Sequence, residues 1–106
     1  MHVLLDECVP RRLKSELPDH TVRTTQEKGW AGLENGALLR AAAARFDVLL
    51  TVDRKMGLQQ DLRGLSIGVV AMIARSNRLV DFRPLMPQVH NVLSEIRAGQ
   101  VLIVGG

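Results

Sequence analysis

Short apolar runs alternate along the chain with segments of helical periodicity. Aliphatic and β-branched side chains gather at residues 2–5, 20–25, 48–52, 67–73 and 101–104. Each run has the length of one strand, and most are apolar throughout, as is typical of strands covered on both faces. The segments between them predict helices over residues 10–17, 34–46, 54–60 and 81–98, with Asp81 as an N-cap and Gly99 as a C-terminal stop. This alternation predicts a three-layer α/β/α sandwich around a parallel sheet of about five strands, joined by right-handed crossovers.

The composition is that of one globular domain spanning residues 1–106, with 46% hydrophobic and 24% charged residues. No apolar run approaches the roughly 20 residues that a membrane-spanning helix needs, and no signal-peptide pattern precedes the first strand. We therefore expect a cytoplasmic protein with no membrane partner. The single cysteine, Cys8, excludes an internal disulfide and a cysteine-based zinc site, and we expect it to be a buried, inert side chain.

The net charge suits a polyanionic partner. Fourteen Lys and Arg against eleven Asp and Glu give a formal charge of +3, and the sequence pI is about 9.8. Aromatic side chains are limited to Trp30, Phe46 and Phe82, so few bases of a nucleic acid can be stacked. A bound nucleic acid would be held mainly through its phosphates.

Acidic and polar side chains follow the predicted strands at the ends where ligands bind in parallel sheets. They are Asp6 and Glu7 after the first strand, Asp53 after the third, Ser76 and Asn77 after the fourth, and Glu34 at the start of the helix leading to the third strand. Gathered carboxylates repel one another unless a cation lies between them, and oxygen ligands of this kind suit Mg²⁺ or Mn²⁺. Such an ion lowers the pKa of bound water and clamps a phosphate, which is the chemistry of phosphodiester cleavage.

Each of these residues also has a purely structural interpretation. An Asp at a strand end caps the next helix, a Glu in the first helical turn is favoured by the helix dipole, and Ser-Asn forms turns. Only the combination of residues favours a functional site.

Several segments resemble the small PIN-like proteins of the DUF5615 (Mut7-C-related) family. The similar segments are LDECVP at residues 5–10, GWAGLENGALL at 29–39, LTVDR at 50–54, and the Gln59-Gln60 pair followed by Leu62. The resemblance extends to about Leu93. It implies a metal-dependent ribonuclease that acts as the toxin of a bacterial toxin–antitoxin pair, with RNA and a cognate antitoxin protein as partners and a homodimer as a plausible assembly.

By this resemblance Asp6 and Asp53 are the main ligands of Mg²⁺ or Mn²⁺, and Glu34 is the third catalytic acid, bound directly or through water. The family's middle Asp falls on Asn35, so Glu34 is displaced by one position. Glu7 and Asn35 are then expected to lie next to the metal ligands and orient them without binding the ion. The side chains expected to hold RNA phosphates are Arg11, Arg54, Arg75, Ser76 and Asn77.

Two other functions are compatible with the pattern. A catalytically silent PIN-like module would bind a partner protein through apolar side chains between Leu79 and Met86 that otherwise belong to the core. The absence of the middle acid favours this alternative. Trp30, in the loop before Glu34, is compatible with stacking a base, with docking a partner and with capping the core. A receiver-like phosphoacceptor domain also has an acidic pair after its first strand, but it needs a Lys after the fifth strand, where this chain has Gly105-Gly106.

Overall fold

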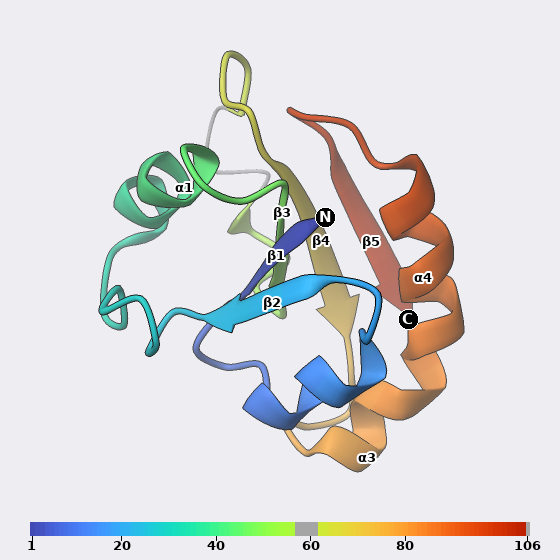
Figure 1. Cartoon of the computed structure of the whole chain (residues 1–106). Coiled ribbons are helices and arrows are strands. Elements are labelled where there is room, and N and C mark those ends of the chain that lie inside the picture. Colours follow the sequence, from blue (N-terminus) through green and yellow to red (C-terminus); the bar gives the residue numbers. More distant parts are fainter. Residues whose placement is uncertain (57–61, 106) are drawn as a thin grey trace.

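Five strands form one parallel sheet, and the structure, a computed structural model, describes residues 1–56 and 62–105. The strands are β1 (His2–Leu5), β2 (Thr21–Thr24), β3 (Val48–Thr51), β4 (Gly68–Ile73) and β5 (Val101–Gly105). They lie in the order β2-β1-β3-β4-β5, and every neighbouring pair is parallel (Figure 1). The parallel α/β fold expected from the sequence is therefore confirmed.

The exposure of each strand matches its place in the sheet. The three inner strands, β1, β3 and β4, are buried at almost every position. The edge strand β2 alternates between exposed and buried residues, and the other edge strand, β5, is buried only at Val104. Apolar runs thus mark strands that have neighbours on both sides and helices on both faces.

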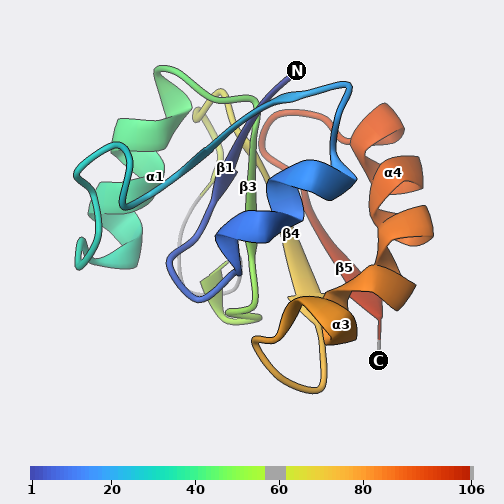
Figure 2. The same cartoon turned by 60° about the horizontal axis from the view of Figure 1, so that its bottom comes forward.

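Helices cover both faces of the sheet. Figure 2 shows α1 (Asn35–Ala43) on one side, and the 3₁₀ helix η1 (Arg11–Glu16), α3 (Leu79–Phe82) and α4 (Met86–Glu95) on the other. Side chains of β1 alternate between two buried clusters, with Val3 and Leu5 in one cluster and Leu4 in the other. This arrangement is consistent with the layered sandwich expected from the sequence.

The first predicted helix is a 3₁₀ helix rather than an α-helix. The N–H of Leu13 donates to the carbonyl of Pro10, and that of Leu17 to the carbonyl of Lys14, so both bonds span three residues. Pro18 disfavours helical geometry at Leu17, which ends the segment after six residues, and short segments tolerate the tighter winding. Leu13 and Leu17 are nevertheless buried, as their spacing predicts.

The last predicted helix is shorter than expected and interrupted. It begins at Leu79 rather than Asp81, passes through the 3₁₀ segment η2 (Arg83–Leu85), and ends at Glu95 rather than Ala98. The ring of Pro84 cannot donate a hydrogen bond and clashes with an α-helical turn before it, which accounts for the change of winding. Asp81 is therefore not an N-cap, because Arg78 holds that position. Gly99 lies in the turn before β5, where its φ of 86° requires glycine.

The remaining segments agree with the sequence to within a few residues. The second helix begins at Asn35 and ends at Ala43, before the Phe46 expected as its end. The helix predicted over residues 54–60 falls partly on 57–61, outside the described residues. No helix within the described ranges combines the length and apolar character that a membrane crossing requires.

Candidate functional site

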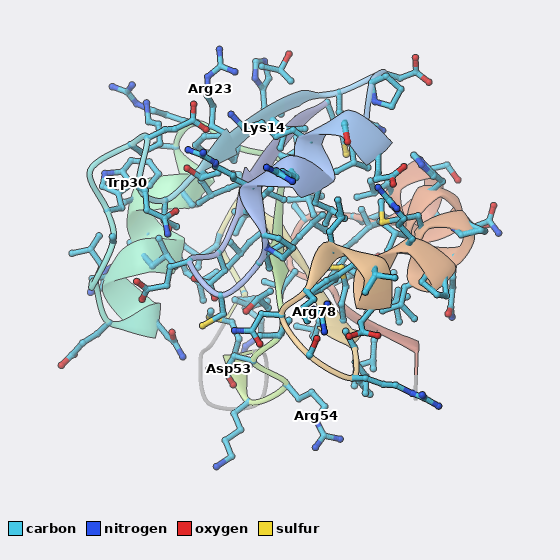
Figure 3. All side chains as sticks on the ribbon, turned by 90° about the horizontal axis from the view of Figure 1, so that it is seen from below. Lys14, Arg23, Trp30, Asp53, Arg54 and Arg78 are labelled. Atoms are coloured by element: carbon cyan, nitrogen blue, oxygen red, sulfur yellow. The ribbon has the colours of Figure 1, made fainter. Side chains whose placement is uncertain are left out.

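Asp6 and Asp53 follow two strands that lie side by side in the middle of the sheet. The chain leaves β1 toward β2 on one side, whereas β3 lies on the other side of β1. In open α/β sheets, ligands bind beyond the carboxyl ends of the strands at such a reversal of strand order. Figure 3 looks onto this edge and shows Asp53 at it.

A single hydroxyl group links the two acidic positions. The hydroxyl of Thr51 donates to Oδ2 of Asp6 at 2.7 Å and accepts the backbone N–H of Asp53 at 3.1 Å. Thr51 is completely buried, at the last position of β3. The N–H of Asp6 donates to the carbonyl of Leu50, which continues the β1–β3 ladder to the acid itself. Both aspartates are therefore held by the rigid centre of the sheet.

The remaining carboxylate oxygens each accept a hydrogen bond as well. Oδ1 of Asp6 accepts the N–H of Glu7 at 2.9 Å, and Oδ1 of Asp53 accepts the N–H of Lys55 at 2.9 Å. Oδ2 of Asp53 accepts Nδ2 of Asn35 at 3.0 Å. A carboxylate oxygen has two lone pairs, so each of these atoms retains capacity for a ligand.

Asn35, and not Glu34, contacts the aspartate pair. Asn35 is the first residue of α1, and its side chain crosses to Asp53 on the neighbouring strand end. Glu34 is the N-cap of α1, where its side chain is exposed and forms no capping hydrogen bond. Asn35, expected only to support the metal ligands, thus contacts Asp53 directly. Glu34, expected as the third acid, faces solvent.

The donor set at this edge fits a hard divalent ion, but with two carboxylates rather than three. Among residues 1–56 and 62–105, no group of three or more His, Cys, Asp or Glu side chains is placed to hold a metal. Mg²⁺ is often held in proteins by one or two carboxylates while substrate phosphates complete its oxygen shell. Asp6 and Asp53 supply two carboxylates at this edge, which is the kind and number of protein ligand that such an ion takes.

The three arginines expected at the site point to different places. Arg54 follows Asp53 directly, but its side chain extends away from the body of the molecule (Figure 3). Arg75 lies in a cleft of about 650 Å³ beyond β4. Arg11 lies in another cleft, of about 660 Å³, beside η1. The structure does not gather them around one phosphate.

The residues after β4 organise a turn. The hydroxyl of Ser76 donates to Asp81 and accepts the N–H of Arg78 at 3.1 Å, while Asn77 is exposed. Asp81 also lines the cleft that contains Arg75. Asp81 is thus an acid near the carboxyl edge that sequence reasoning assigned only to a helix cap.

Thr51 is the residue that sequence reasoning missed at the site. Its signal was a hydroxyl at the end of an otherwise apolar strand, two positions before Asp53. A buried hydroxyl requires partners, and the nearest polar groups at that strand end are the two aspartates.

Three further expectations have clear outcomes. Glu7 is exposed, and it supports Asp6 through its backbone N–H rather than its side chain. Cys8 is exposed, which corrects the expectation that it is buried. Trp30 is half-buried and packs edge-to-face on Phe46 at 6.0 Å between ring centroids, so it caps the α1-side cluster.

Comparisons of the chain with protein-family models, characterised proteins and solved structures found no significant match. The features that bear on function are therefore the geometry of the carboxyl edge and the sequence motifs.

Proposed function

We propose that this protein is a metal-dependent ribonuclease of the PIN-like kind, with Asp6 and Asp53 as the ligands of Mg²⁺ or Mn²⁺. The observation that supports it most is the common anchoring of both aspartates on the hydroxyl of Thr51 at the strand-order reversal. The buried hydroxyl fixes the carboxylate of Asp6 and the backbone of Asp53, and the amide of Asn35 holds the carboxylate of Asp53. Carboxylates held in this way are preorganised, so little rearrangement opposes ion binding.

The roles of the residues follow from their contacts. A bound divalent ion would supply a water of lowered pKa and offset the charge on a phosphate. Thr51 orients the carboxylate of Asp6, and the amide of Asn35 orients that of Asp53. Glu34, exposed at the start of α1, would act only through an intervening water.

The biological setting belongs to the same proposal. The motifs LDECVP and LTVDR resemble those of toxin components, so the chain would act on RNA in a bacterial cytoplasm and be restrained by a cognate antitoxin, with a homodimer as its assembly. The net charge of +3 favours an anionic substrate.

A catalytically silent protein-binding module is the second candidate. It is favoured by Asn35, which stands beside Asp53 where a third carboxylate would complete a stronger metal site. The apolar side chains between Leu79 and Met86 make a poor docking surface for such a module. Phe82 and Met86 are buried in the core, and only Val80 among them is strongly exposed. The nuclease therefore remains the leading proposal.

The test is calorimetric titration of the protein with Mn²⁺, followed by an assay on single-stranded RNA. The double variant Asp6→Asn, Asp53→Asn removes both charges while keeping oxygen acceptors for the hydroxyl of Thr51 and the amide of Asn35. The matched control is Asp19→Asn, Glu95→Gln, which removes two exposed carboxylates before β2 and at the end of α4.

We expect Mn²⁺ binding and RNA cleavage in the wild type and the control, and neither in the Asp6, Asp53 variant. Equal heats from all three proteins, or none from any, would reject the metal mechanism. Metal binding without cleavage would favour the silent module.

A further inference from the structure

A cleft of about 660 Å³ opens beside the aspartate pair, between η1 and the end of β2. Its wall includes Glu7, whose backbone N–H donates to Asp6, so the cleft begins one residue from the proposed metal ligand. Its volume is within the range of about 300–1,000 Å³ usual for ligand sites.

Two arginines in this cleft have guanidinium groups that are exposed to solvent. Arg11 and Arg12 both line it and are exposed. Neither guanidinium forms an ion pair or hydrogen bond with any part of the chain that the structure describes. A guanidinium presents paired donors that match the oxygens of a phosphate.

The third cation of the cleft, Lys14, is paired. Its ammonium group contacts Glu27, which lies in the turn after β2. Glu27 is fixed in that turn, because its Oε1 accepts the N–H of Thr24 at 3.0 Å and its own N–H donates to the hydroxyl of Thr24 at 3.1 Å. The cleft therefore holds two exposed arginines, a lysine neutralised by a tethered acid, and the exposed carboxylate of Glu7 on its wall. Three cations against two acids leave it with a net charge of +1.

We propose that this cleft, which we call the η1 cleft, binds backbone phosphates of the single-stranded nucleic acid substrate, on the β2 side of the aspartate pair. Arg11 and Arg12 hold the phosphates, and Glu27 limits the affinity by neutralising Lys14. The inference deepens the proposed ribonuclease function and rests on it. The substrate would then run from the carboxyl ends of β1 and β3 toward β2, and away from the cleft of Arg75.

The test is binding of a short, labelled, single-stranded oligoribonucleotide, measured by fluorescence anisotropy in EDTA over a series of salt concentrations. EDTA separates this binding from metal chemistry. The variant Arg11→Ala, Arg12→Ala is compared with Arg40→Ala, Arg45→Ala, which removes the same charge from exposed positions late in α1 and in the turn before β3. Circular dichroism verifies that each variant is folded.

We expect the Arg11, Arg12 variant to bind about 25-fold more weakly at about 0.1 M salt, with a salt slope smaller by about 1.4, because each phosphate contact on a single strand releases about 0.7 counterion. The control should stay within about twofold of the wild type. Glu27→Gln keeps the acceptor for the N–H of Thr24 but frees Lys14, so it should bind about fivefold more tightly by the same relation.

Equal losses in the arginine variant and its control would overturn the η1 cleft, and so would an absence of RNA binding by the wild type. RNA cleavage that persists in the Arg11, Arg12 variant with an unchanged KM would reject the cleft while leaving the ribonuclease in place. A loss of binding in a protein that cleaves no RNA would support the cleft and reject the nuclease. A DNA oligonucleotide of the same length and sequence, bound equally, would show that phosphates alone are recognised.

Discussion

Thr51 serves two partners with one hydroxyl group, as donor to Asp6 and as acceptor from the N–H of Asp53. Thr51→Val has nearly the same shape but leaves both partners without their hydrogen bond. We expect a loss of about 1–3 kcal/mol in the free energy of unfolding, measured by chemical denaturation, because unsatisfied buried polar groups are costly. Thr51→Ser keeps the hydroxyl and is the matched control. A valine variant as stable as the serine variant would show that the hydroxyl only fills space.

The side chain that contacts Asp53 is the neutral amide of Asn35, so no second carboxylate lies at that position. Asn35→Asp replaces a hydrogen-bond donor with a third carboxylate, which repels Asp53 when no cation is present. We expect lower stability in EDTA and an affinity for Mn²⁺ raised about tenfold or more, since the charge of the ligands sets the affinity of oxygen sites.

Calorimetry and thermal denaturation with and without Mn²⁺ measure both effects of Asn35→Asp. Asn91→Asp, which adds the same charge to an exposed position on α4, is the control. An unchanged Mn²⁺ affinity in Asn35→Asp would place the ion away from Asp53.

The aspartates could be located from the sequence, whereas the side chains around them could not. Asp6 and Asp53 follow from strand ends, because parallel strands end at the same edge of a sheet. The choice between Glu34 and Asn35 depended on where α1 begins, and one residue turns a helical side chain by about 100°. Long side chains such as Arg54 are placed by solvent and rotamer freedom, which the sequence does not encode.

Close packing between β4 and the end of α4 depends on a residue without a side chain. A Cβ atom at Gly68 would lie 2.8 Å from Cδ1 of Ile96 and 3.1 Å from the carbonyl oxygen of Arg97. Gly68→Ala should therefore destabilise the protein by about 1–3 kcal/mol, as overpacking of a core does. The measurement is the midpoint of urea unfolding.

A double-mutant cycle with Ile96→Ala identifies the cause of that loss. Removing the Ile96 side chain relieves its clash, so Gly68→Ala should cost clearly less in this background, with a coupling of about 0.5 kcal/mol or more. Strict additivity of the two substitutions would assign the loss to the backbone at Gly68 instead.

At the scale of elements, the strands were more predictable than the helices. The inner strands are apolar because helices cover both of their faces, so nearly every residue of these strands must be buried. Helix length and continuity instead depended on single prolines: Pro18 ended the first segment after six residues, and Pro84 interrupted the last with a 3₁₀ turn. The spacing of apolar residues indicates that a helix is present, but it does not show where a single proline ends or interrupts that helix.

The order of the strands in the sheet is a property of the whole molecule, and it could not be predicted from the hydrophobic pattern alone. Strands pair through backbone groups that are the same in every residue, so side chains reveal only which strands are inner and which are at an edge. The alternation in β2 and the exposure of β5 agree with their edge positions. The resulting reversal beside β1 brings Asp6 next to β3 and the η1 cleft next to Asp6.

Stability as a function of pH combines two groups on either side of β2, His20 before the strand and Glu27 after it. Burial, the nearby N-terminal amine and His90 lower the pKa of His20 below 6.5, against the opposing effect of Asp19. The hydrogen bond from Lys14, followed by that from the N–H of Thr24, lowers the pKa of Glu27 below 4.5. In both cases the unfolded chain binds the proton more tightly than the folded protein, so protonation favours unfolding.

The stabilisation from His20 is therefore complete above pH 6.5 and is lost as the pH falls toward its lowered pKa, while that from Glu27 is lost only below pH 4.5. The contribution of Glu27 is small, about 1 kcal/mol or less, because solvent screens exposed ion pairs. We expect the melting temperature to fall in two steps between pH 7 and pH 3. His20→Gln should flatten the first step and Glu27→Gln the second, each without affecting the other. His90→Gln removes one of the groups that lower the pKa of His20 and should therefore weaken the first step. A first step that is unchanged in both histidine variants would assign it to another group.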